Sequence, residues 1–369
     1  MNPFQRNAPK TILVIVTRRI GDVLLTTPLI RSLKNAWPDA QIDALVFKGT
    51  EGILSANPDI RNLITIAARP SLGEHLGLLG EIWRRYDLAV SVIPGDRPTI
   101  YAWAAGKFRV GIVVASLKHR WKQLLLNRWT PLDDLNTHTV LMNLKLTDLL
   151  GIKPDHKVIV SWSEEDEKQA RSLLPFDMEV TPYALLHPYP MYAYKTWHQQ
   201  GWLDIAAWLV SRGVRIVFSG GGSADELAYV HGLAADLPGG VEGVINAAGK
   251  LSLGAVGFVA SRAKIYVGPD TAVTHIAAAT GTPTMALYGP SNPVKWGPWP
   301  SGHNANENPF GMRGSQIVGN VALMQGNDPR DCVPCLGEGC EKRINSLSDC
   351  LQHLPATRVI AAAKALLCR

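Results

Sequence analysis

Short hydrophobic runs alternate with amphipathic segments along most of the chain. The run at 11–17 predicts a fully buried parallel strand, and the runs at 41–47 and 86–93 predict two more. The segment 23–37 predicts a continuous helix. Its hydrophobic face consists of Val23, Thr27, Ile30, Leu33 and Trp37. A second helix is expected near 76–85. Strands that alternate with helices predict a parallel, doubly wound sheet.

The same alternation starts again after about residue 180. Strands are predicted at 183–188, 214–220, 264–269 and 284–290, and helices at 201–213, 225–237, 254–262 and 356–367. An acidic helix at 163–174 separates the two halves. We therefore expect an α/β chain with two Rossmann-like doubly wound domains facing across a cleft. The first domain is predicted at 1–178 and the second at 179–345. The remaining residues, 346–369, are expected to form a C-terminal helix that packs back on the first domain.

The composition is that of a globular protein, and it does not identify a ligand. The chain has 369 residues, of which 46% are hydrophobic and 18% charged, so each half can bury an ordinary core. No run is long enough to span a bilayer or to form a signal peptide, and we expect a cytoplasmic protein. The net charge of +6 suits an anionic substrate, an anionic membrane face or nucleic acid.

The first turn, "TRRIGDVLLTTP", places Asp22 just after a strand. Asp22 is either a helix cap or a general base that takes a proton from an acceptor hydroxyl in the cleft. The adjacent Arg18 and Arg19 suit an anionic acceptor, but they can equally be a solvated pair.

The stretch "VGPDTAVTHIAAATGTP" combines a strand end with the start of a helix rich in small residues. The first amides of a helix attract anions, yet this helix begins at a carboxylate, Asp270. If Asp270 caps one amide, Thr271 stays available to a phosphate oxygen. His275 lies one turn further on the same face and can donate another hydrogen bond.

Two further loops follow strands of the second half. Lys195 lies in an aromatic-rich loop, where it is either a surface lysine or a cation that neutralises a leaving diphosphate. The turn "FSGGGSADEL" is not a dinucleotide fingerprint, because Asp225 stands where the third glycine is expected. It can hold a ribose or a base, with Glu226 as hydroxyl acceptor, or be only a tight turn.

The segment 116–129 carries Lys118, Arg120, Lys122 and Arg128 with no acid, interleaved with Trp and Leu. It is expected to be a solvated amphipathic helix, to rest on an anionic membrane face, or to grip a phosphorylated acceptor. Nucleic acid is disfavoured because no recognition motif accompanies the segment.

Four of the five cysteines lie close together near the C-terminus, at Cys332, Cys335, Cys340 and Cys350. Four thiolates can bind a structural zinc ion, but the second pair is not a CxxC. A reduced or partly disulfide-linked cluster is the alternative.

Taken together, four segments resemble glycosyltransferase family 9, the lipopolysaccharide heptosyltransferases, over nearly the whole chain. They are "GDVLLTTPLIRSLKNAWPDAQIDALV", "YDLAVSV", "KTWHQQGWLDIA" and "GKLSLGAVGFVASRAKIYVGPDTAVTHIAAATGTPTMALYGPSNP". The resemblance implies a GT-B fold and a metal-independent, inverting transfer of heptose from ADP-heptose to the lipopolysaccharide inner core. Together with the basic segment 116–129, this suggests a protein that works peripherally at the anionic inner face of the inner membrane, and we expect no required cofactor and no nucleic acid.

Residue roles follow from the same resemblance. Asp22 matches the catalytic base, and Lys195 matches a diphosphate contact. The other matched donor-binding positions are Asp270, Thr271, Ala272 and His275. An acid of the glycine-rich loop also matches a nucleotide contact; it is Asp225 or Glu226, and we favour Glu226. Apart from the resemblance, we expect cations of the first half to bind the acceptor: Arg18, Arg19, Arg97 and Arg120.

The chain departs from the family pattern at Ala272, where the family has glycine. The sequence Asp-Thr-Ala at 270–272, together with the stretches "YKTW", "ADELAYV" and "KWGPW", resembles the sequences of the heptosyltransferase III branch. The alternatives are a GT-B-like enzyme on another nucleotide sugar, such as an epimerase, and a non-catalytic sugar-nucleotide-binding protein.

Overall fold

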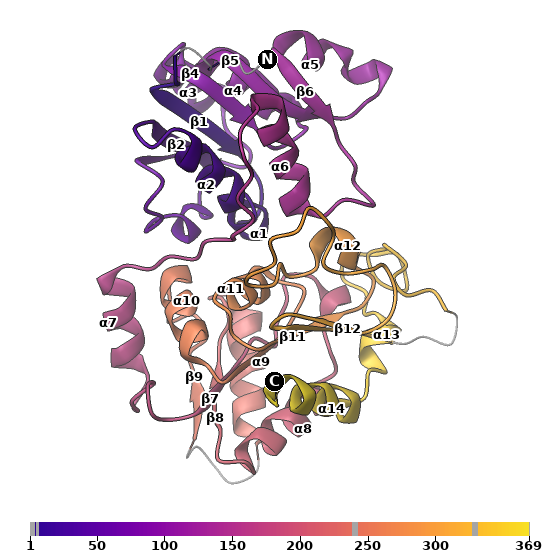
Figure 1. Cartoon of the computed structure of the whole chain (residues 1–369). Coiled ribbons are helices and arrows are strands. Elements are labelled where there is room, and N and C mark those ends of the chain that lie inside the picture. Colours follow the sequence, from indigo (N-terminus) through magenta and orange to yellow (C-terminus); the bar gives the residue numbers. More distant parts are fainter. Residues whose placement is uncertain (1–3, 5–6, 238–242, 327–330, 369) are drawn as a thin grey trace. The chain divides into compact units, whose positions relative to one another are not determined.

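The computed structural model describes residue 4 and residues 7–237, 243–326 and 331–368 (Figure 1). The chain forms two compact units. The first comprises Met1–Ser161 with Asn304–Glu307, and the second comprises Trp162–His303 with Asn308–Arg369. No helix in the described ranges has both the length and the apolar character needed to cross a bilayer.

The first unit is built on a six-stranded parallel sheet with strand order β3-β2-β1-β4-β5-β6. Its strands are β1 (Thr11–Val16), β2 (Gln41–Phe47), β3 (Asn62–Ile66), β4 (Tyr86–Ser91), β5 (Gly106–Val113) and β6 (Arg128–Pro131). The order reverses between β1 and β4, and ligands of doubly wound sheets bind outside the carboxyl ends of the strands at such a point.

Helices cover both faces of this sheet (Figure 1). They are α1 (Ile20–Leu24), α2 (Thr27–Ala36), α3 (Leu72–Ile82), α4 (Asp96–Ala105), α5 (Arg120–Leu125) and α6 (Thr139–Leu150). α2 packs against α6. α4 packs on β1, β4 and β5 and has α3 and α5 as neighbours.

The predicted helix at 23–37 is divided in two. α1 ends at Leu24 and α2 begins at Thr27, with Pro28 in its first turn. Proline lacks an amide N–H and cannot continue the first helix. The Thr27 hydroxyl donates to the carbonyl of Leu24 at 2.8 Å, so this carbonyl at the end of α1 has a hydrogen-bond partner. The predicted apolar face is nonetheless buried.

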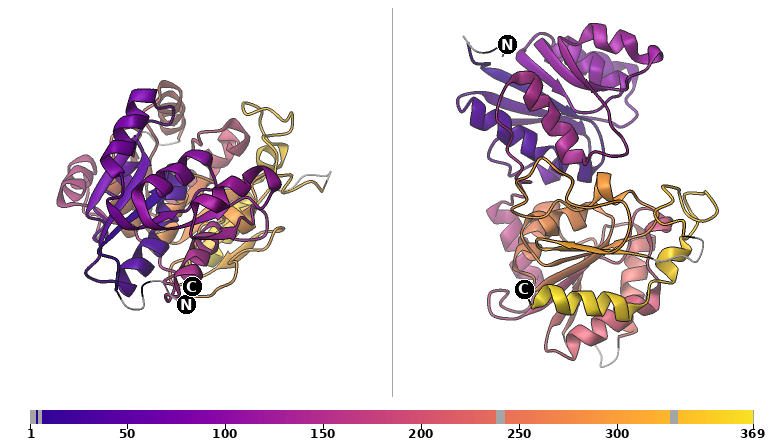
Figure 2. Two further views of the ribbon diagram at one scale, coloured as in Figure 1. Left: turned by 90° about the horizontal axis from the view of Figure 1, so that it is seen from above. Right: turned by 45° about the vertical axis from the view of Figure 1, so that its right-hand side comes forward.

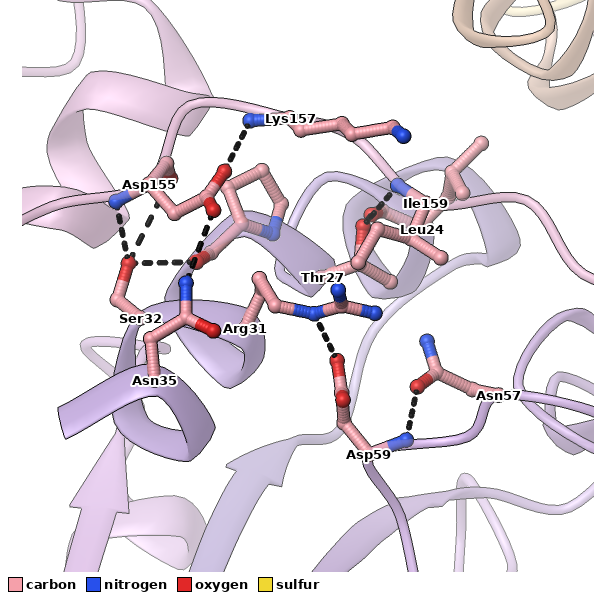
Figure 3. Close-up of polar contacts among 11 residues, drawn as sticks. Leu24, Thr27, Arg31, Ser32, Asn35, Asn57, Asp59, Asp155, Lys157 and Ile159 are labelled. Atoms are coloured by element: carbon pink, nitrogen blue, oxygen red, sulfur yellow. Dashed lines mark hydrogen bonds and ion pairs between the residues drawn. The ribbon is translucent and has the colours of Figure 1, made fainter. Parts of the chain in front are cut away.

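Polar side chains of α2 hold the last segment of the first unit (Figure 3). The amide of Ile159 donates to the hydroxyl of Thr27 at 2.9 Å. The amide of Asp155 donates to the hydroxyl of Ser32 at 2.8 Å, and Asn35 donates to the Asp155 carboxylate at 3.0 Å. The helix that follows Asp22 is thereby fixed to residues more than a hundred positions away.

The second unit has a seven-stranded sheet with order β12-β13-β11-β10-β7-β8-β9, parallel except for the β12–β13 pair. Its strands are β7 (Tyr183–Leu186), β8 (Arg215–Phe218), β9 (Val244–Asn246), β10 (Ile265–Pro269), β11 (Thr284–Tyr288), β12 (Gln316–Val318) and β13 (Val321–Gln325). The reversal between β7 and β10 repeats that of the first sheet, so both predicted doubly wound sheets are confirmed.

The helices of this unit are α7 (Glu164–Leu173), α8 (Gln199–Val210), α9 (Ala224–Ala235), α10 (Leu253–Arg262), α11 (Ala272–Ala279), α12 (Pro293–Trp296), α13 (Asp349–Gln352) and α14 (Ala356–Leu367). The contacts divide the chain after Ser161 and not after residue 178, because the acidic α7 packs against α10. α14, drawn in yellow in Figure 2, packs against α8 and β13 of its own unit, where we had expected it on the first domain.

Candidate active site

Asp22 lies at the carboxyl edge of the first sheet, in the short helix α1 that follows β1. Only 9% of the residue is exposed. Arg19, and not Asp22, holds the N-cap position of α1, so the cap interpretation of Asp22 is wrong. The Nε atom of Arg18 lies 3.7 Å from Oδ2 of Asp22. The structure thus places a buried carboxylate beside a cation at a strand-order reversal, where ligands of doubly wound sheets bind.

The predicted acceptor arginines follow three adjacent strands. Arg18 and Arg19 come after β1, Arg97 lies in the first turn of α4 after β4, and Arg120 begins α5 after β5. Carboxyl ends of parallel strands share one edge, so these cations lie along the edge that holds Asp22. Part of the Arg97 guanidinium already has a protein partner, because its Nη1 atom donates to the carbonyl of Ala68 at 3.0 Å.

The basic segment 116–129 is not one solvated helix. A 3-10 turn, η2 (Leu117–His119), precedes α5, and Arg128 already belongs to β6. Lys122 is only 2% exposed, and its Nζ atom lies 2.6 Å from Oδ1 of Asp96. That contact holds the pKa of Asp96 below its usual value. Leu117 of η2 and Leu124 of α5 are 82% and 86% exposed.

The second candidate half-site lies where β10 ends, at the strand-order reversal of the second sheet. The helix α11 begins at Ala272, and its N-cap is Thr271, whose side chain makes no capping hydrogen bond. The prediction that Asp270 caps this helix is therefore wrong. The Asp270 carboxylate turns instead to Lys195, whose Nζ atom lies 2.5 Å from Oδ2 and donates to the Asp270 carbonyl at 3.2 Å.

This ion pair is buried. The strongest influence on Asp270 is burial, which raises its pKa, but the attraction of Lys195 and a hydrogen bond from Ser291 outweigh it. The pKa of Asp270 consequently lies below its usual value, and the carboxylate is charged at neutral pH. The hydroxyl of Tyr288 adds a contact at 3.2 Å to Oδ1, and the charge of Asp270 raises the pKa of this already buried phenol.

His275 is the third member of this cluster. It is only 5% exposed, and its Nδ1 atom has no hydrogen-bond partner among the residues that the structure describes. Burial lowers the pKa of His275 to about 4, so the ring is neutral. A buried polar atom without a partner is costly, and it is satisfied when a ligand supplies the missing contact.

The two acids of the glycine-rich turn, Asp225 and Glu226, differ in their surroundings. Asp225 is exposed, whereas Glu226 is half-buried and takes part in a hydrogen bond with the backbone of Gly221. Burial raises the pKa of Glu226. A Cβ atom on Gly221 would lie only 2.6 Å from Oε2 of Glu226, so the side chain covers the turn closely. Glu226, and not Asp225, therefore packs against the turn, and its contact with the donor stays a prediction.

Sequence reasoning missed three polar side chains at this edge: His187, Tyr288 and Ser291. His187 directly follows β7, and its Nδ1 atom lies 3.1 Å from the hydroxyl of Ser219. Burial lowers the pKa of His187 to about 4. Each of the three ends or follows a strand that borders β10 or β7, a position that the strand-order argument could have identified.

The C-terminal cysteines lie in the second unit as free thiols. Cys350 is buried, Cys332 is half-buried, and Cys335 and Cys340 are exposed. Burial and the three neighbouring thiols raise the pKa of Cys350 to about 12. Within the described ranges, no three or more His, Cys, Asp or Glu side chains are grouped so that they can hold a metal ion, and the structural zinc stays a prediction.

Comparisons with known proteins agree on one family. The model of "Glycosyltransferase family 9 (heptosyltransferase)" matches residues 99–314. Lipopolysaccharide heptosyltransferase 3 of Escherichia coli (strain K12) is 30% identical to the chain, over 76% of this chain and 82% of that protein.

Solved structures agree at the level of the fold. The family 9 glycosyl transferase of Veillonella parvula DSM 2008 has a TM-score of 0.76 and 21% identity, with 97% of each chain covered. E. coli heptosyltransferase WaaC, solved with ADP-2-deoxy-2-fluoro heptose, has a TM-score of 0.67 and 20% identity, over 96% of this chain and 99% of that one. The expected GT-B class with two Rossmann-like units is confirmed.

Proposed function

The chain belongs to glycosyltransferase family 9, and from this premise we propose that it moves a heptose from ADP-heptose to the inner core of lipopolysaccharide. ADP-heptose is proposed as donor because WaaC was solved with an analogue of it. The lipopolysaccharide core is proposed as acceptor because of the named activity of the E. coli relative. Similarity to that relative also favours the heptosyltransferase III branch.

One observation carries the donor half of this proposal: the buried pair of Lys195 and Asp270 beside the start of α11. The Lys195 ammonium donates to two oxygens of Asp270, and because it has three N–H bonds, one remains for a phosphate oxygen. The N-terminal amides of α11 and Nδ1 of His275 supply further contacts. These groups would stabilise the charge that develops on the departing ADP.

We propose Asp22 as the base of the transfer. Its carboxylate takes the proton of the acceptor hydroxyl as that oxygen attacks the anomeric carbon. The bond between this carbon and the β-phosphate oxygen breaks on the opposite side, so the configuration inverts, and ADP leaves with the bonding electrons. No metal ion and no cofactor enter this scheme.

We further propose that the enzyme works peripherally on the anionic inner face of the inner membrane, in the cytoplasm. Residues 71–129 contain nine Lys or Arg against four Asp or Glu. The exposed large hydrophobic residues of α3, η2 and α5 lie in the same segment: Leu72, Leu76, Leu117, Trp121 and Leu124. Apolar side chains next to cations are typical of surfaces that rest on anionic lipid.

The decisive experiment combines the purified chain with ADP-heptose and lipopolysaccharide from a heptose-deficient strain. We expect ADP release and an acceptor mass increased by one heptose, only when both substrates are present, and with activity retained in a chelator. Consumption of the sugar nucleotide without acceptor would instead support the epimerase alternative. Donor binding without turnover on any core acceptor would support a non-catalytic binding protein.

A further inference from the structure

We propose that residues 346–354, the brace segment, position Lys195 for the diphosphate of the donor. Within this segment, Ser348 and Gln352 are the positioning residues. The inference rests on the proposed function, because it concerns the same cation. It gives a role to the C-terminal segment, which the catalytic scheme leaves unexplained.

Two hydrogen bonds fix the backbone on either side of Lys195. The Ser348 hydroxyl donates to the carbonyl of Tyr194 at 2.7 Å, and the Gln352 side-chain amide donates to the carbonyl of Thr196 at 2.7 Å. Ser348 is buried, so water does not compete for its bond. Lys195 itself ends a short 3-10 turn, η3 (Ala193–Lys195), which has few hydrogen bonds of its own.

The brace segment also holds the residues that follow. Trp197 is fully buried, and its Nε1 atom donates to the carbonyl of Leu354 at 2.8 Å. The Nδ1 atom of His198 accepts the amide of Gly201, which leaves Nε2 to donate to the same Leu354 carbonyl at 2.9 Å. Residues 194–198 are thus held at four points by one distant segment.

The same segment packs against the other side of the ion pair. A Cβ atom on Gly289 would lie 2.8 Å from the side chain of Leu351 and 3.2 Å from Sγ of Cys350, so the loop after β11 rests closely on the segment. Two residues further on, Ser291 hydrogen-bonds the Asp270 carboxylate. The brace segment therefore supports both loops that meet at Asp270.

The hydrogen bonds from Ser348 and Gln352 fix the position of the backbone that carries Lys195. The Nζ atom of Lys195 lies 2.5 Å from Oδ2 of Asp270, and a fixed backbone narrows the range of positions that its flexible four-carbon side chain can reach. Loss of either flanking hydrogen bond would let the loop between β7 and α8 move and misplace the cation. A displacement of about 1 Å is enough to weaken a preorganised contact.

The test compares Ser348→Ala and Gln352→Met with Ser346→Ala. Ser346 is a matched control, because it is a buried serine of the same segment whose hydroxyl, among the described residues, bonds only to the carbonyls of Glu338 and Arg343. We expect Ser348→Ala and Gln352→Met to raise the Kd for ADP and the KM for the donor about threefold to tenfold, the range of one lost hydrogen bond. Ser346→Ala should leave both unchanged, and Ser348→Thr should restore them.

A second arm repeats Ser348→Ala in a Lys195→Met background. If the serine acts through the lysine, it has no further effect on ADP binding there. An undiminished effect, or equal effects of Ser348→Ala and Ser346→Ala, would overturn the inference while leaving the proposed function intact. If Lys195→Met alone leaves the Kd for ADP unchanged, the diphosphate role of Lys195 fails, and the inference fails with it.

Discussion

The Nζ atom of Lys195 lies 2.5 Å from Oδ2 of Asp270, and both side chains are largely buried. Two opposite charges in contact make the site nearly neutral, which explains how a carboxylate can stand beside the start of a helix that attracts anions. Asp270 does not compete with a phosphate for the first amides of α11. It pairs instead with Lys195, for which we propose a contact with that phosphate.

Replacement of Lys195 by Met should leave Asp270 buried without its partner. We expect a loss of stability at pH 7 of about 3 kcal/mol or more, because breaking a buried pair strands a charge. ADP affinity should fall as well. Adding Asp270→Asn should recover stability but not binding, as measured by thermal unfolding and ADP calorimetry. A double variant that binds ADP like the parent would exclude the phosphate role of Lys195.

Replacement of Asp22 by Asn preserves shape and removes the base. Transfer should fall by about 10²–10⁴, the usual contribution of general base catalysis, while the Kd for ADP is unchanged. Stopped assays of acceptor mass and ADP calorimetry separate the two quantities. Asp39→Asn, at an exposed position of the same unit, serves as control. Undiminished turnover of Asp22→Asn would mean that another group takes the proton.

Acid should destabilise the second unit before its carboxylates titrate. Burial lowers the pKa of His187 and of His275 to about 4, against about 6.5 in an unfolded chain. Between these values the unfolded state binds more protons than the folded one, so stability is full above about pH 6.5 and declines toward pH 4. Unfolding midpoints measured from pH 7.5 to 4.5 should fall less steeply for His275→Gln. An unchanged slope would show that His275 does not contribute.

Two neighbouring glycines offer a matched test of the glycine-rich turn. A methyl group on Gly221 would meet the Glu226 carboxylate, whereas one on Gly222 would have nothing within 4 Å. We therefore expect Gly221→Ala to displace Glu226 and weaken ADP binding, and Gly222→Ala to leave it unaffected. Calorimetry on both variants, with unfolding midpoints as a folding check, decides. Equal affinities would argue against a donor contact by Glu226.

The membrane proposal predicts a loss of vesicle binding without loss of chemistry. Leu124→Glu places a carboxylate on the exposed side of α5 and should abolish cosedimentation with vesicles containing about one third phosphatidylglycerol. Transfer to a soluble, delipidated core acceptor should be unchanged. Val180→Glu is the control, since Val180 is 76% exposed but lies in the second unit. Equal binding by both variants would locate the lipid contact elsewhere.

Much of the fold could be predicted from local patterns. Buried strands and amphipathic helices have periods that a sequence displays, and the β1 and β10 runs appear almost at their predicted bounds. The break between α1 and α2 was missed because the apolar face continues through it, although Pro28 marks it. The boundary after Ser161 depends on packing of α7 against α10, which has no local signal.

The sequence pointed to candidate residues more readily than to the contacts that these residues make with one another. Asp270 was predicted at the donor site, and a local argument assigned its carboxylate to the nearest amides, but its partner lies 75 positions away. The partner of Lys122 was missed for the same reason, because its own segment contains no acid and Asp96 contacts it through the packing of α4 and α5. Ion pairs across elements are set by the tertiary fold.

The hydrogen bond from Ser348 to the Tyr194 carbonyl spans 154 positions. Translation proceeds from the N-terminus, so the loop with Lys195 emerges from the ribosome long before the segment that holds it. Until then the nascent second unit can form its parallel strands but not a fixed cation beside Asp270. If Lys195 contacts the donor as proposed, the nascent protein cannot fix this cation beside Asp270 until residues 346–354 have been synthesised.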